Sequence, residues 1–283
     1  MRVLITGAHG QVGHELVEAF GDHDLVALGH HDLDVTDRQA VLEATFAHRP
    51  AAIVHAAAWT AVDACETDPR RAFSTNAMGT RNVAEAARRV GAYLTYFSTD
   101  YVFDGTKAEP YVEWDRPAPM SVYGHSKLAG EVELGTNPDS SVARISWVCG
   151  RHGSNMVKTI LALAGRHEKL AFVDDQRGRP TFAPDAARIV RQLVVDRRPG
   201  LFHVTNEGEV TWYEFARAVL EAAGMDPNRV RPITTAELDP PRPAPRPANS
   251  VLDTVALRAA GFPPLPHFRD SLARLIAELG ASG

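Results

Sequence analysis

MRVLITGAHGQVG, residues 1–13, carries the clearest structural signal in this sequence. Residues 3–5 form a continuous apolar run, which is typical of a strand buried in a parallel sheet. Three glycines follow with the spacing GxxGxxG, at Gly7, Gly10 and Gly13. A helix is expected from Val12 onwards, so the stretch predicts a strand, a tight turn and a helix N-terminus in direct succession.

This succession suits the binding of a dinucleotide. Glycines let the main chain approach a pyrophosphate closely, and the free N–H groups and positive dipole end of a helix attract it. A purely structural turn is the alternative. The strand before the glycines and the helix after them favour a cofactor site.

The same alternation of short apolar runs and longer helical patterns continues along the chain. It covers residues 25–28, 38–47, 52–54, 73–90 and 93–97. We predict repeated βαβ units and a doubly wound parallel α/β sheet of the Rossmann type. Beyond about residue 145 the pattern loosens. We therefore expect a dinucleotide-binding domain over residues 1–145 and a smaller C-terminal α/β substrate-binding lobe over 146–283, with some segments returning to the first domain.

Two segments of the C-terminal half have their own signals. Residues 239–247 are rich in proline and arginine and can be neither helix nor central strand. We expect an extended loop, either a surface connector or a substrate-side loop whose arginines face a phosphate. Residues 268–279 place their leucines on one face and predict a packing helix.

The charge and cysteine content exclude several classes of function. A net charge of −5 creates no global basic field, so we expect no nucleic-acid or membrane partner. Cys65 and Cys149 fit no disulfide framework, and no apolar stretch reaches the roughly 18 residues that cross a bilayer. The histidines show no metal-ligand spacing. We expect a cytoplasmic protein without a metal site, either a monomer or a homodimer.

The end of the second predicted strand bears on the choice of cofactor. Sites specific for NAD usually carry an acid there for the ribose hydroxyls, but Leu28 is followed by Gly29, His30 and His31. A missing acid removes repulsion against a 2′-phosphate, and a protonatable histidine favours it. We therefore expect NADPH or NADH as cofactor. Alternatively, both histidines are ordinary exposed loop residues.

Tyr123 and Lys127 form a YxxxK pair at the start of a predicted helix that runs through residue 134. Residues four apart share a helix face. Hydride reduction of a ketone leaves an alkoxide that must be protonated, and we propose Tyr123 as the acid, with its pKa lowered by the Lys127 ammonium. The pair alone is often ordinary helix surface. The strand that precedes it ends in STDYVFDG (98–105), which places Thr99 at the ligand-binding edge of the sheet and favours catalysis.

With these residues noted, the chain resembles the extended short-chain dehydrogenases, and within them the dTDP-4-dehydrorhamnose reductase family. The resemblance runs nearly end to end. Its motifs are TGAHGQVG (6–13), AAAWTAVDACE (56–66), NAMGTRN (76–82), STDYVFDG (98–105), YGHSKLAGE (123–131), RISWVCG (144–150), DDQRGRPT (174–181) and RPANSVLD (246–253).

The resemblance implies roles for individual residues. It makes Thr99, Tyr123 and Lys127 the catalytic set. It implies that the dinucleotide contacts Gly10, Gln11, Val12, Asp34, Val35, Ala58, Trp59 and Thr60. It implies that the sugar contacts Thr99, Asp100 and Trp147, with Tyr101 as a further candidate. Asn155, Gln176, Arg179 and Arg246 are candidate donors to the nucleotide diphosphate.

The resemblance implies NAD(P)H-dependent reduction of the 4-keto group of dTDP-6-deoxy-L-lyxo-4-hexulose to dTDP-L-rhamnose. Cys149 replaces the aromatic residue common after Trp147 and Val148, so a reductase of another nucleotide-linked 4-keto-deoxysugar stays open. A non-catalytic dinucleotide-binding regulatory subunit is the alternative from another class; the intact catalytic set argues against it. An epimerase or dehydratase shares the fold, but Tyr101 rather than a glutamate follows Asp100, which counts against dehydration.

Overall fold

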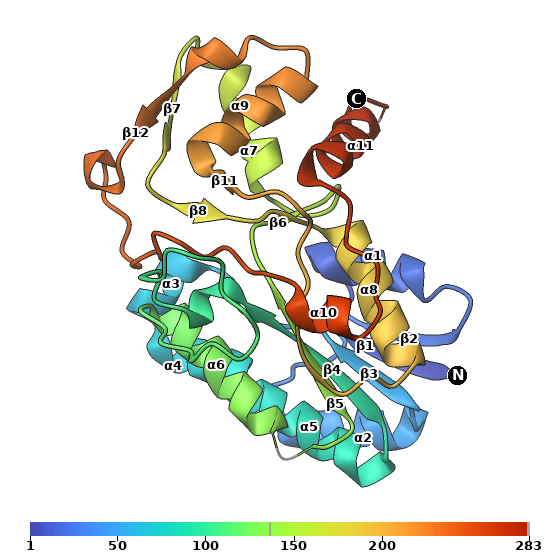
Figure 1. Ribbon diagram of the computed structural model, residues 1–283. Helices are drawn as coiled ribbons and strands as arrows, with labels where there is room; N and C mark the ends of the chain where they lie inside the picture. Colours follow the sequence, from blue (N-terminus) through green and yellow to red (C-terminus); the bar gives the residue numbers. More distant parts are fainter. Residues whose placement is uncertain (136, 282–283) are drawn as a thin grey trace.

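The computed structural model describes residues 1–135 and 137–281. Its centre is a parallel sheet of six strands in the order β10-β5-β4-β3-β1-β2 (Figure 1). The strands are β1 (Arg2–Thr6), β2 (Asp24–Leu28), β3 (Ala52–His55), β4 (Tyr93–Thr99), β5 (Ser140–Ile145) and β10 (Gly200–His203). The chain moves in opposite directions from β1 toward β2 and toward β3, so the sheet has its topological switch point at β1 and β3.

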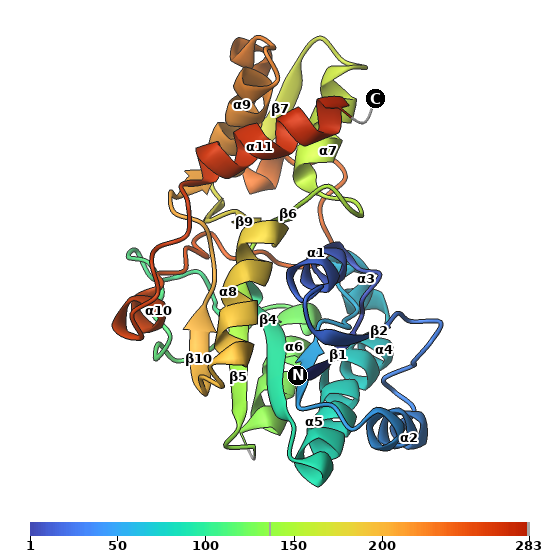
Figure 2. The same cartoon turned by 90° about the vertical axis from the view of Figure 1, so that its right-hand side faces the viewer.

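Helices cover both faces of this sheet, which is why its central strands β1 and β3 carry continuous apolar runs. Val3 and Ile5 pack on one face against α1 (Gln11–Ala19) and α8 (Ala183–Val195). Leu4 points the other way. That second face is covered by α2 (Arg38–His48), α5 (Gly79–Val90) and α6 (Val122–Leu134). Figures 1 and 2 show the sheet between these two helical layers.

Short elements join the strands to these helices at the ligand-binding edge of the sheet. They are α3 (Val62–Thr67), α4 (Pro69–Phe73), the π-helical turn η1 (Ser74–Met78) and the 3-10 turn η2 (Asp100–Val102). Because α4, η1 and α5 follow one another directly, the chain passes from the cofactor side of the sheet to its covered face without a loop.

The C-terminal lobe lies above the sheet in Figure 1 and has a core of its own, built mainly by its three longer helices. These are α7 (Met156–Ala164), α9 (Trp212–Ala222) and α11 (Phe268–Ala281). Its strands form pairs: β6 (Val148–Cys149) with β9 (Thr181–Phe182), β7 (Leu170–Val173) with β12 (Val230–Ile233), and β8 (Arg177–Gly178) with β11 (Val210–Thr211). The remaining elements are η3 (Pro227–Arg229), η4 (Thr235–Glu237) and α10 (Val255–Ala259).

The predicted fold class is confirmed: a doubly wound parallel α/β sheet with a smaller lobe. Several segments beyond residue 145 belong to the sheet and its covering layer, namely α8, β10 and α10. The exact boundary between the two domains stays a prediction. Residues 239–247 form neither helix nor strand, as expected, and the C-terminal helix covers the predicted range.

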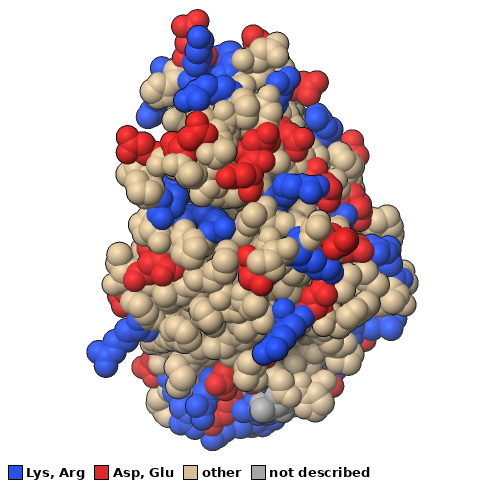
Figure 3. All heavy atoms as spheres, turned by 60° about the vertical axis from the view of Figure 1, so that its left-hand side comes forward, with Lys and Arg blue, Asp and Glu red and all other residues tan. Residues whose placement is uncertain are grey.

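The surface bears on possible partners. Within the described residues, none of the helices combines the length and the apolar character that a membrane crossing requires. On the face shown in Figure 3, basic and acidic side chains are interspersed. That distribution agrees with a small net charge spread over many local ion pairs.

Candidate functional site

Two cavities lie at the carboxyl ends of the strands. One, of about 830 Å³, is lined by the phosphate loop after β1, the loop after β2 and the segment after β3. The other, of about 360 Å³, is lined by the ends of β4 and β5 and by α6. Gly10, Ala56 and Ala58 line both, so the two cavities adjoin at the switch point of the sheet. We call them the adenosine cavity and the catalytic cavity.

The phosphate loop is shaped for close approach of a ligand. Gly7 has a φ of 71°, and a Cβ there would lie 2.5 Å from the nitrogen of Ala57. A Cβ on Gly13 would lie 2.1 Å from the Gly7 carbonyl oxygen. Gly10 caps α1 without any side-chain hydrogen bond, which leaves the N–H groups of the first turn for a ligand. The residues present therefore fit a dinucleotide pyrophosphate.

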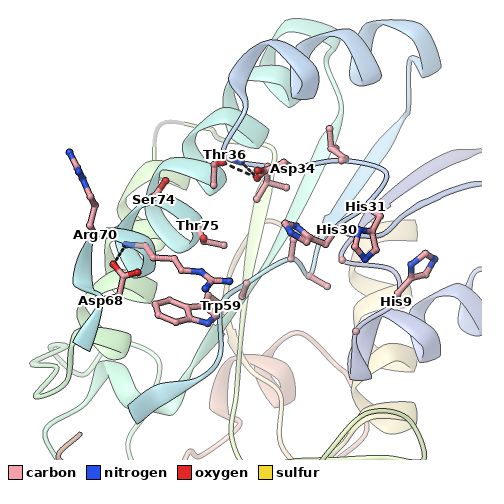
Figure 4. A pocket seen from close by; sticks show the side chains of 18 residues that line it. His9, His30, His31, Asp34, Thr36, Trp59, Asp68, Arg70, Ser74 and Thr75 are labelled. Atoms are coloured by element: carbon pink, nitrogen blue, oxygen red, sulfur yellow. Dashed lines mark hydrogen bonds between the residues drawn. The ribbon is translucent and has the colours of Figure 1, made fainter. Parts of the chain in front are cut away.

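The adenosine cavity is a broad hollow between the loop after β2 and the turns of α4 (Figure 4). Asp34 and Val35 line one side, and the ring of Trp59 lines the other. Asp34 accepts hydrogen bonds from the N–H and hydroxyl of Thr36, and these bonds lower the pKa of its carboxyl. Asp37 caps α2, and its side chain accepts hydrogen bonds from the N–H groups of Gln39 and Ala40.

Trp59 is held by two residues that the sequence analysis did not single out, Arg71 and Asn76. The guanidinium of Arg71 lies 4.6 Å above the Trp59 ring, a cation–π contact. Asn76, fully buried in the π-helical turn, accepts a hydrogen bond from the Trp59 N–H at 2.8 Å and donates to its carbonyl at 3.1 Å. It also donates to the Ser126 hydroxyl at 2.9 Å, which ties the cofactor segment to helix α6. Its place in NAMGTRN (76–82) was the available signal.

The catalytic cavity gathers the predicted chemistry. Thr99, Tyr123 and Lys127 all line it, and each is at least nine-tenths buried. Tyr123 and Lys127 reach it because Ser121 caps α6 and sets the start of the helix one residue before Tyr123. The structure therefore brings the three residues of the proposed set to one wall of one cavity.

The expected lowering of the Tyr123 pKa is wrong for this structure. Burial raises the pKa of Tyr123 well above its ordinary value, and interaction with the Thr99 hydroxyl opposes the rise only in part. Lys127 is itself buried, which lowers its pKa to about 7, and its Nζ lies 4.2 Å from the centre of the Tyr96 ring. Tyr123 is thus a protonated phenol, which is the form that donates a proton.

Thr99 and Asp100 form a linked pair at the end of β4. The Thr99 hydroxyl accepts from the N–H of Tyr101 at 3.2 Å and donates to Asp100 Oδ1 at 3.0 Å. Burial raises the pKa of Asp100 to about 6. Its Oδ2 is buried and has no partner among the described residues, and the side chain lines the cavity. Tyr101 also lines it and packs edge-on against Tyr123.

Trp147 lines the catalytic cavity, and Cys149 does not. The Trp147 ring stacks on Trp212 with 3.5 Å between centroids, and a Cβ on Gly178 would lie 2.6 Å from it. Its main chain is left-handed, with a φ of 47°. Cys149 is buried in the core of the C-terminal lobe, and burial raises its pKa to about 12. Cys149 therefore lies outside the lining of the catalytic cavity, and the effect of replacing the common aromatic residue on substrate choice stays a prediction.

The structure brings the predicted cofactor residues together but leaves four predicted substrate residues outside the catalytic cavity. The adenosine cavity takes Gly7, Gly10, His30, Asp34, Val35, Ala58 and Trp59, and the catalytic cavity takes Gln11, Val12, Gly13, Thr60, Tyr123 and Lys127. The four outside are Asn155, Gln176, Arg179 and Arg246. Their role in substrate binding stays a prediction.

Three of the four make hydrogen bonds within the protein, whereas Nε and Nη1 of Arg179 are buried without a hydrogen-bond partner among the described residues. Asn155 caps α7 and donates to Gln11 Oε1 at 3.0 Å. Gln176 donates to the hydroxyl of Thr235, and Arg179 lies 3.8 Å from a Glu207 oxygen. Arg246 binds both carboxylate oxygens of Asp63, at 2.8 and 2.9 Å. The sequence offers no sign of these partners, because most lie far along the chain.

Comparisons with known proteins agree with this architecture. The family model described as "RmlD substrate binding domain" matches residues 1–281. A dTDP-4-dehydrorhamnose reductase of Streptomyces griseus is 42% identical, with 96% of this chain and 91% of that protein aligned. A protein of Streptomyces antibioticus, a probable dTDP-4,6-dihydroxy-2-methyloxan-3-one 4-ketoreductase, is 43% identical, with 100% and 97% aligned.

A solved structure extends the similarity to three dimensions. The crystal structure of dTDP-4-dehydrorhamnose reductase from Bacillus anthracis in complex with NADP superposes with a TM-score of 0.94 at 38% identity. It covers 98% of this chain and 99% of that one. The resemblance inferred from the sequence motifs is thereby confirmed. The chain belongs to the RmlD substrate binding domain family, the family of the dTDP-4-dehydrorhamnose reductases that it resembles.

Proposed function

We propose that this protein is an NAD(P)H-dependent reductase that converts dTDP-6-deoxy-L-lyxo-4-hexulose to dTDP-L-rhamnose by reducing its 4-keto group. The observation that carries the proposal is the meeting of Thr99, Tyr123 and Lys127 in a cavity that adjoins the dinucleotide cradle. The named activities of relatives about 40% identical over the full length supply the substrate.

When bound, the reduced nicotinamide supplies the hydride for the carbonyl carbon. Tyr123 donates its phenolic proton to the carbonyl oxygen, and its raised pKa keeps that proton in place until negative charge develops. To donate a hydrogen bond to the same oxygen and stabilise the charge where it forms, the Thr99 hydroxyl would turn its proton away from Asp100 Oδ1. Its acceptance of the Tyr101 N–H holds the hydroxyl in position before the reaction.

Lys127 would bind the hydroxyls of the nicotinamide ribose. Its burial excludes water from the ammonium, so a ribose hydroxyl would replace the missing solvent as an acceptor. Glu131, one helical turn further along α6, pairs with buried Arg144 on β5 and anchors the helix to the sheet. That pair would keep Lys127 and Tyr123 in fixed positions relative to the carboxyl ends of β4 and β5.

On the sugar side, Asp100 and Tyr101 would bind hydroxyls, and Trp147 would form a flat apolar wall against the deoxysugar ring. The dTDP diphosphate would reach Arg246 only if that side chain leaves Asp63. We further propose that the protein works in the cytoplasm, as a monomer or a homodimer.

A second candidate substrate is another nucleotide-linked 4-keto-deoxysugar. The Streptomyces antibioticus relative favours it, because it is as similar as the rhamnose-pathway relatives and its name describes a different keto-sugar. A purely regulatory role is less well supported, since the whole catalytic set is present in one cavity.

The test is oxidation of NADPH or NADH by purified protein supplied with the dTDP-4-keto sugar or with a panel of related keto-sugars. We expect turnover with the first, and a loss of about 10²- to 10⁴-fold in Tyr123→Phe with dinucleotide affinity retained. Tyr213→Phe, in the C-terminal lobe, is the matched control. Faster turnover of another keto-sugar would move the assignment to the second candidate, and no oxidation with any of them would overturn the reductase.

A further inference from the structure

The space beside Gly29 is filled by the ring of His9. A Cβ built on Gly29 would lie 2.1 Å from His9 Nδ1 and 2.7 Å from Cε1. His9 comes from the phosphate loop and Gly29 from the end of β2, so the ring closes the gap between two loops of the adenosine cavity. Any side chain at position 29 would therefore collide with the His9 ring.

That position decides which dinucleotide binds. In dinucleotide folds of this type, an acid about 20 residues beyond the glycine loop accepts bonds from the ribose 2′-hydroxyl, and a cation nearby accommodates a 2′-phosphate. Here an imidazole occupies the volume where an acid would begin. At the adenosine ribose, a carboxylate that accepts hydrogen bonds is thus replaced by an imidazole that can donate one.

His30 and His31 extend this histidine lining across the loop after β2. Both line the adenosine cavity with His9, and both are exposed (Figure 4). The nearest acids are engaged elsewhere: Asp32 accepts from the Gly29 N–H at 2.8 Å, and Asp34 accepts from Thr36. These bonds hold both carboxylates in place but do not remove their charge, so a 2′-phosphate would need the histidines to outweigh that repulsion.

Other charged groups face these histidines from the neighbouring elements. From α1, His14 lies 6.3 Å from the His9 ring and stacks in turn on His152. From the far wall, α4 contributes two arginines, and Asp68 stands at its start. The charged and titratable groups around the cavity are His9, His14, His30, His31, Asp32, Asp34, Asp68, Arg70, Arg71 and His152.

We propose that His9 and His30 form a binding site for the 2′-phosphate of NADPH, and that this site makes the protein prefer NADPH over NADH. The proposal rests on the proposed use of a nicotinamide dinucleotide. It goes beyond that use by assigning cofactor choice to two imidazoles that line the adenosine cavity. No turnover is needed to test it.

The first test is calorimetric titration with 2′,5′-ADP and with ADP, two fragments that differ in the position of one phosphate, alongside NADPH and NADH. We expect His9→Ala and His30→Ala each to weaken 2′,5′-ADP binding about tenfold, the loss of one charge-assisted hydrogen bond, and to change ADP binding little. His167→Ala, an exposed histidine of the C-terminal lobe, is the control. Equal losses for both fragments would overturn the proposal, because they would indicate a general structural role.

The second test is the ratio of the NADPH and NADH affinities. The two dinucleotides share all other phosphates, so only the 2′-phosphate contributes to this ratio. We expect the preference for NADPH to fall several-fold in His9→Ala/His30→Ala relative to the unmodified protein. An unchanged ratio in the double variant would contradict the proposal.

A third variant separates steric exclusion from charge. His9→Gly/Gly29→Asp vacates the ring and restores an acid, so NADH should bind more tightly than NADPH. Gly29→Asp alone should bind neither well, because the new side chain meets the His9 ring. Failure of the double variant to gain NADH affinity, with its melting temperature unchanged, would overturn the assignment of this position. A protein that binds none of the four ligands would instead defeat the proposed function itself.

Discussion

Asn76 binds the main chain of Trp59 at both ends of its amide, accepting from the N–H at 2.8 Å and donating to the carbonyl at 3.1 Å. These bonds hold the segment after β3 against the π-helical turn, between the adenosine and catalytic cavities. The same amide donates to Ser126, which stands beside Lys127 in α6. One buried side chain therefore fixes the cofactor segment relative to the catalytic helix.

Asn76→Ala should lower the free energy of unfolding by about 1 to 3 kcal/mol, because partly buried main-chain groups of Trp59 lose their partners. At a temperature where the variant is fully folded, its dinucleotide affinity should still be lower than that of the unmodified protein. Asn76→Asp keeps the acceptor for the Trp59 N–H but loses both donated bonds, so its affinity should be intermediate. Calorimetric titration with NADPH and a melting curve measure the two effects. Unchanged affinity in a destabilised Asn76→Ala would contradict a positioning role.

The strand, glycine turn and helix of residues 1–19 could be predicted because each is encoded locally. The apolar run, the GxxGxxG spacing and the helix N-terminus lie within one short segment, and their contacts need no distant partner. The YxxxK pair was predictable for the same reason. Its two residues share a helix face whatever packs around them.

The pKa of Tyr123 could not be predicted in this way. A neighbouring ammonium is visible in the sequence, but burial depends on what the rest of the chain places over the side chain. The bonds of Arg246 to Asp63 likewise join residues 183 apart in the sequence. Tertiary contacts of this kind decide whether a polar residue faces a ligand or another part of the protein.

Lys127 should destabilise the protein in a pH-dependent manner. Burial lowers its pKa to about 7 in the folded state, against about 10.4 in an unfolded chain. Between these values the unfolded chain binds more protons, so stability rises with pH through this window, and the cost of the buried charge is greatest below pH 7. Lys127→Met should therefore melt higher than the unmodified protein at pH 6, with the difference vanishing toward pH 10.

Melting curves across this range check the prediction. Lys169→Met, at an exposed position before β7, is the control and should give a difference that does not vary with pH in this manner. A Lys127→Met difference that is constant from pH 6 to 10 would show that the lysine is charged throughout, held so by Glu131, whose charge favours the ammonium.

Glu131 and Arg144 form a buried ion pair at 2.7 Å, with 8% and 2% of their side chains exposed. Ser98 adds a hydrogen bond to Glu131 Oε1 at 2.5 Å. Glu131→Leu should cost about 3 to 5 kcal/mol because it leaves the guanidinium buried and unpaired, whereas Glu131→Leu/Arg144→Leu should recover most of the loss. Urea denaturation of the unmodified protein, Glu131→Leu, Arg144→Leu and the double variant gives the coupling energy.

The exposed pair of Arg197 and Asp139, joined at 2.9 Å, is the comparison for this cycle. Its coupling should stay below about 1 kcal/mol, since water screens both charges. Similar coupling energies in the two pairs would mean that burial does not strengthen the interaction between Glu131 and Arg144. If Glu131→Leu/Arg144→Leu is as stable as the unmodified protein but has a much lower kcat, the ion pair orients α6 for catalysis and is not required for folding.

The loop of residues 239–247 is either a surface connector or a substrate-side loop whose arginines bind a phosphate. Arg246 makes a bidentate pair with Asp63 of α3, and the Ala244 N–H adds a third bond at 3.2 Å. If Arg246 serves the dTDP diphosphate, it must first leave Asp63, so the pair opposes binding. Asp63→Asn should then tighten dTDP binding about three- to tenfold, by weakening a charge-assisted pair.

Arg246→Ala should weaken dTDP binding, and Asp63→Asn/Arg246→Ala should match Arg246→Ala alone, because the aspartate acts only through the arginine. Arg242→Ala tests specificity, since Arg242 reaches the same carboxylate at 3.4 Å from a more exposed position. Calorimetric titration with dTDP measures all four variants. If Asp63→Asn and Arg246→Ala both leave dTDP affinity unchanged while lowering the melting temperature, the loop is a structural connector and Arg246 takes no part in the diphosphate site.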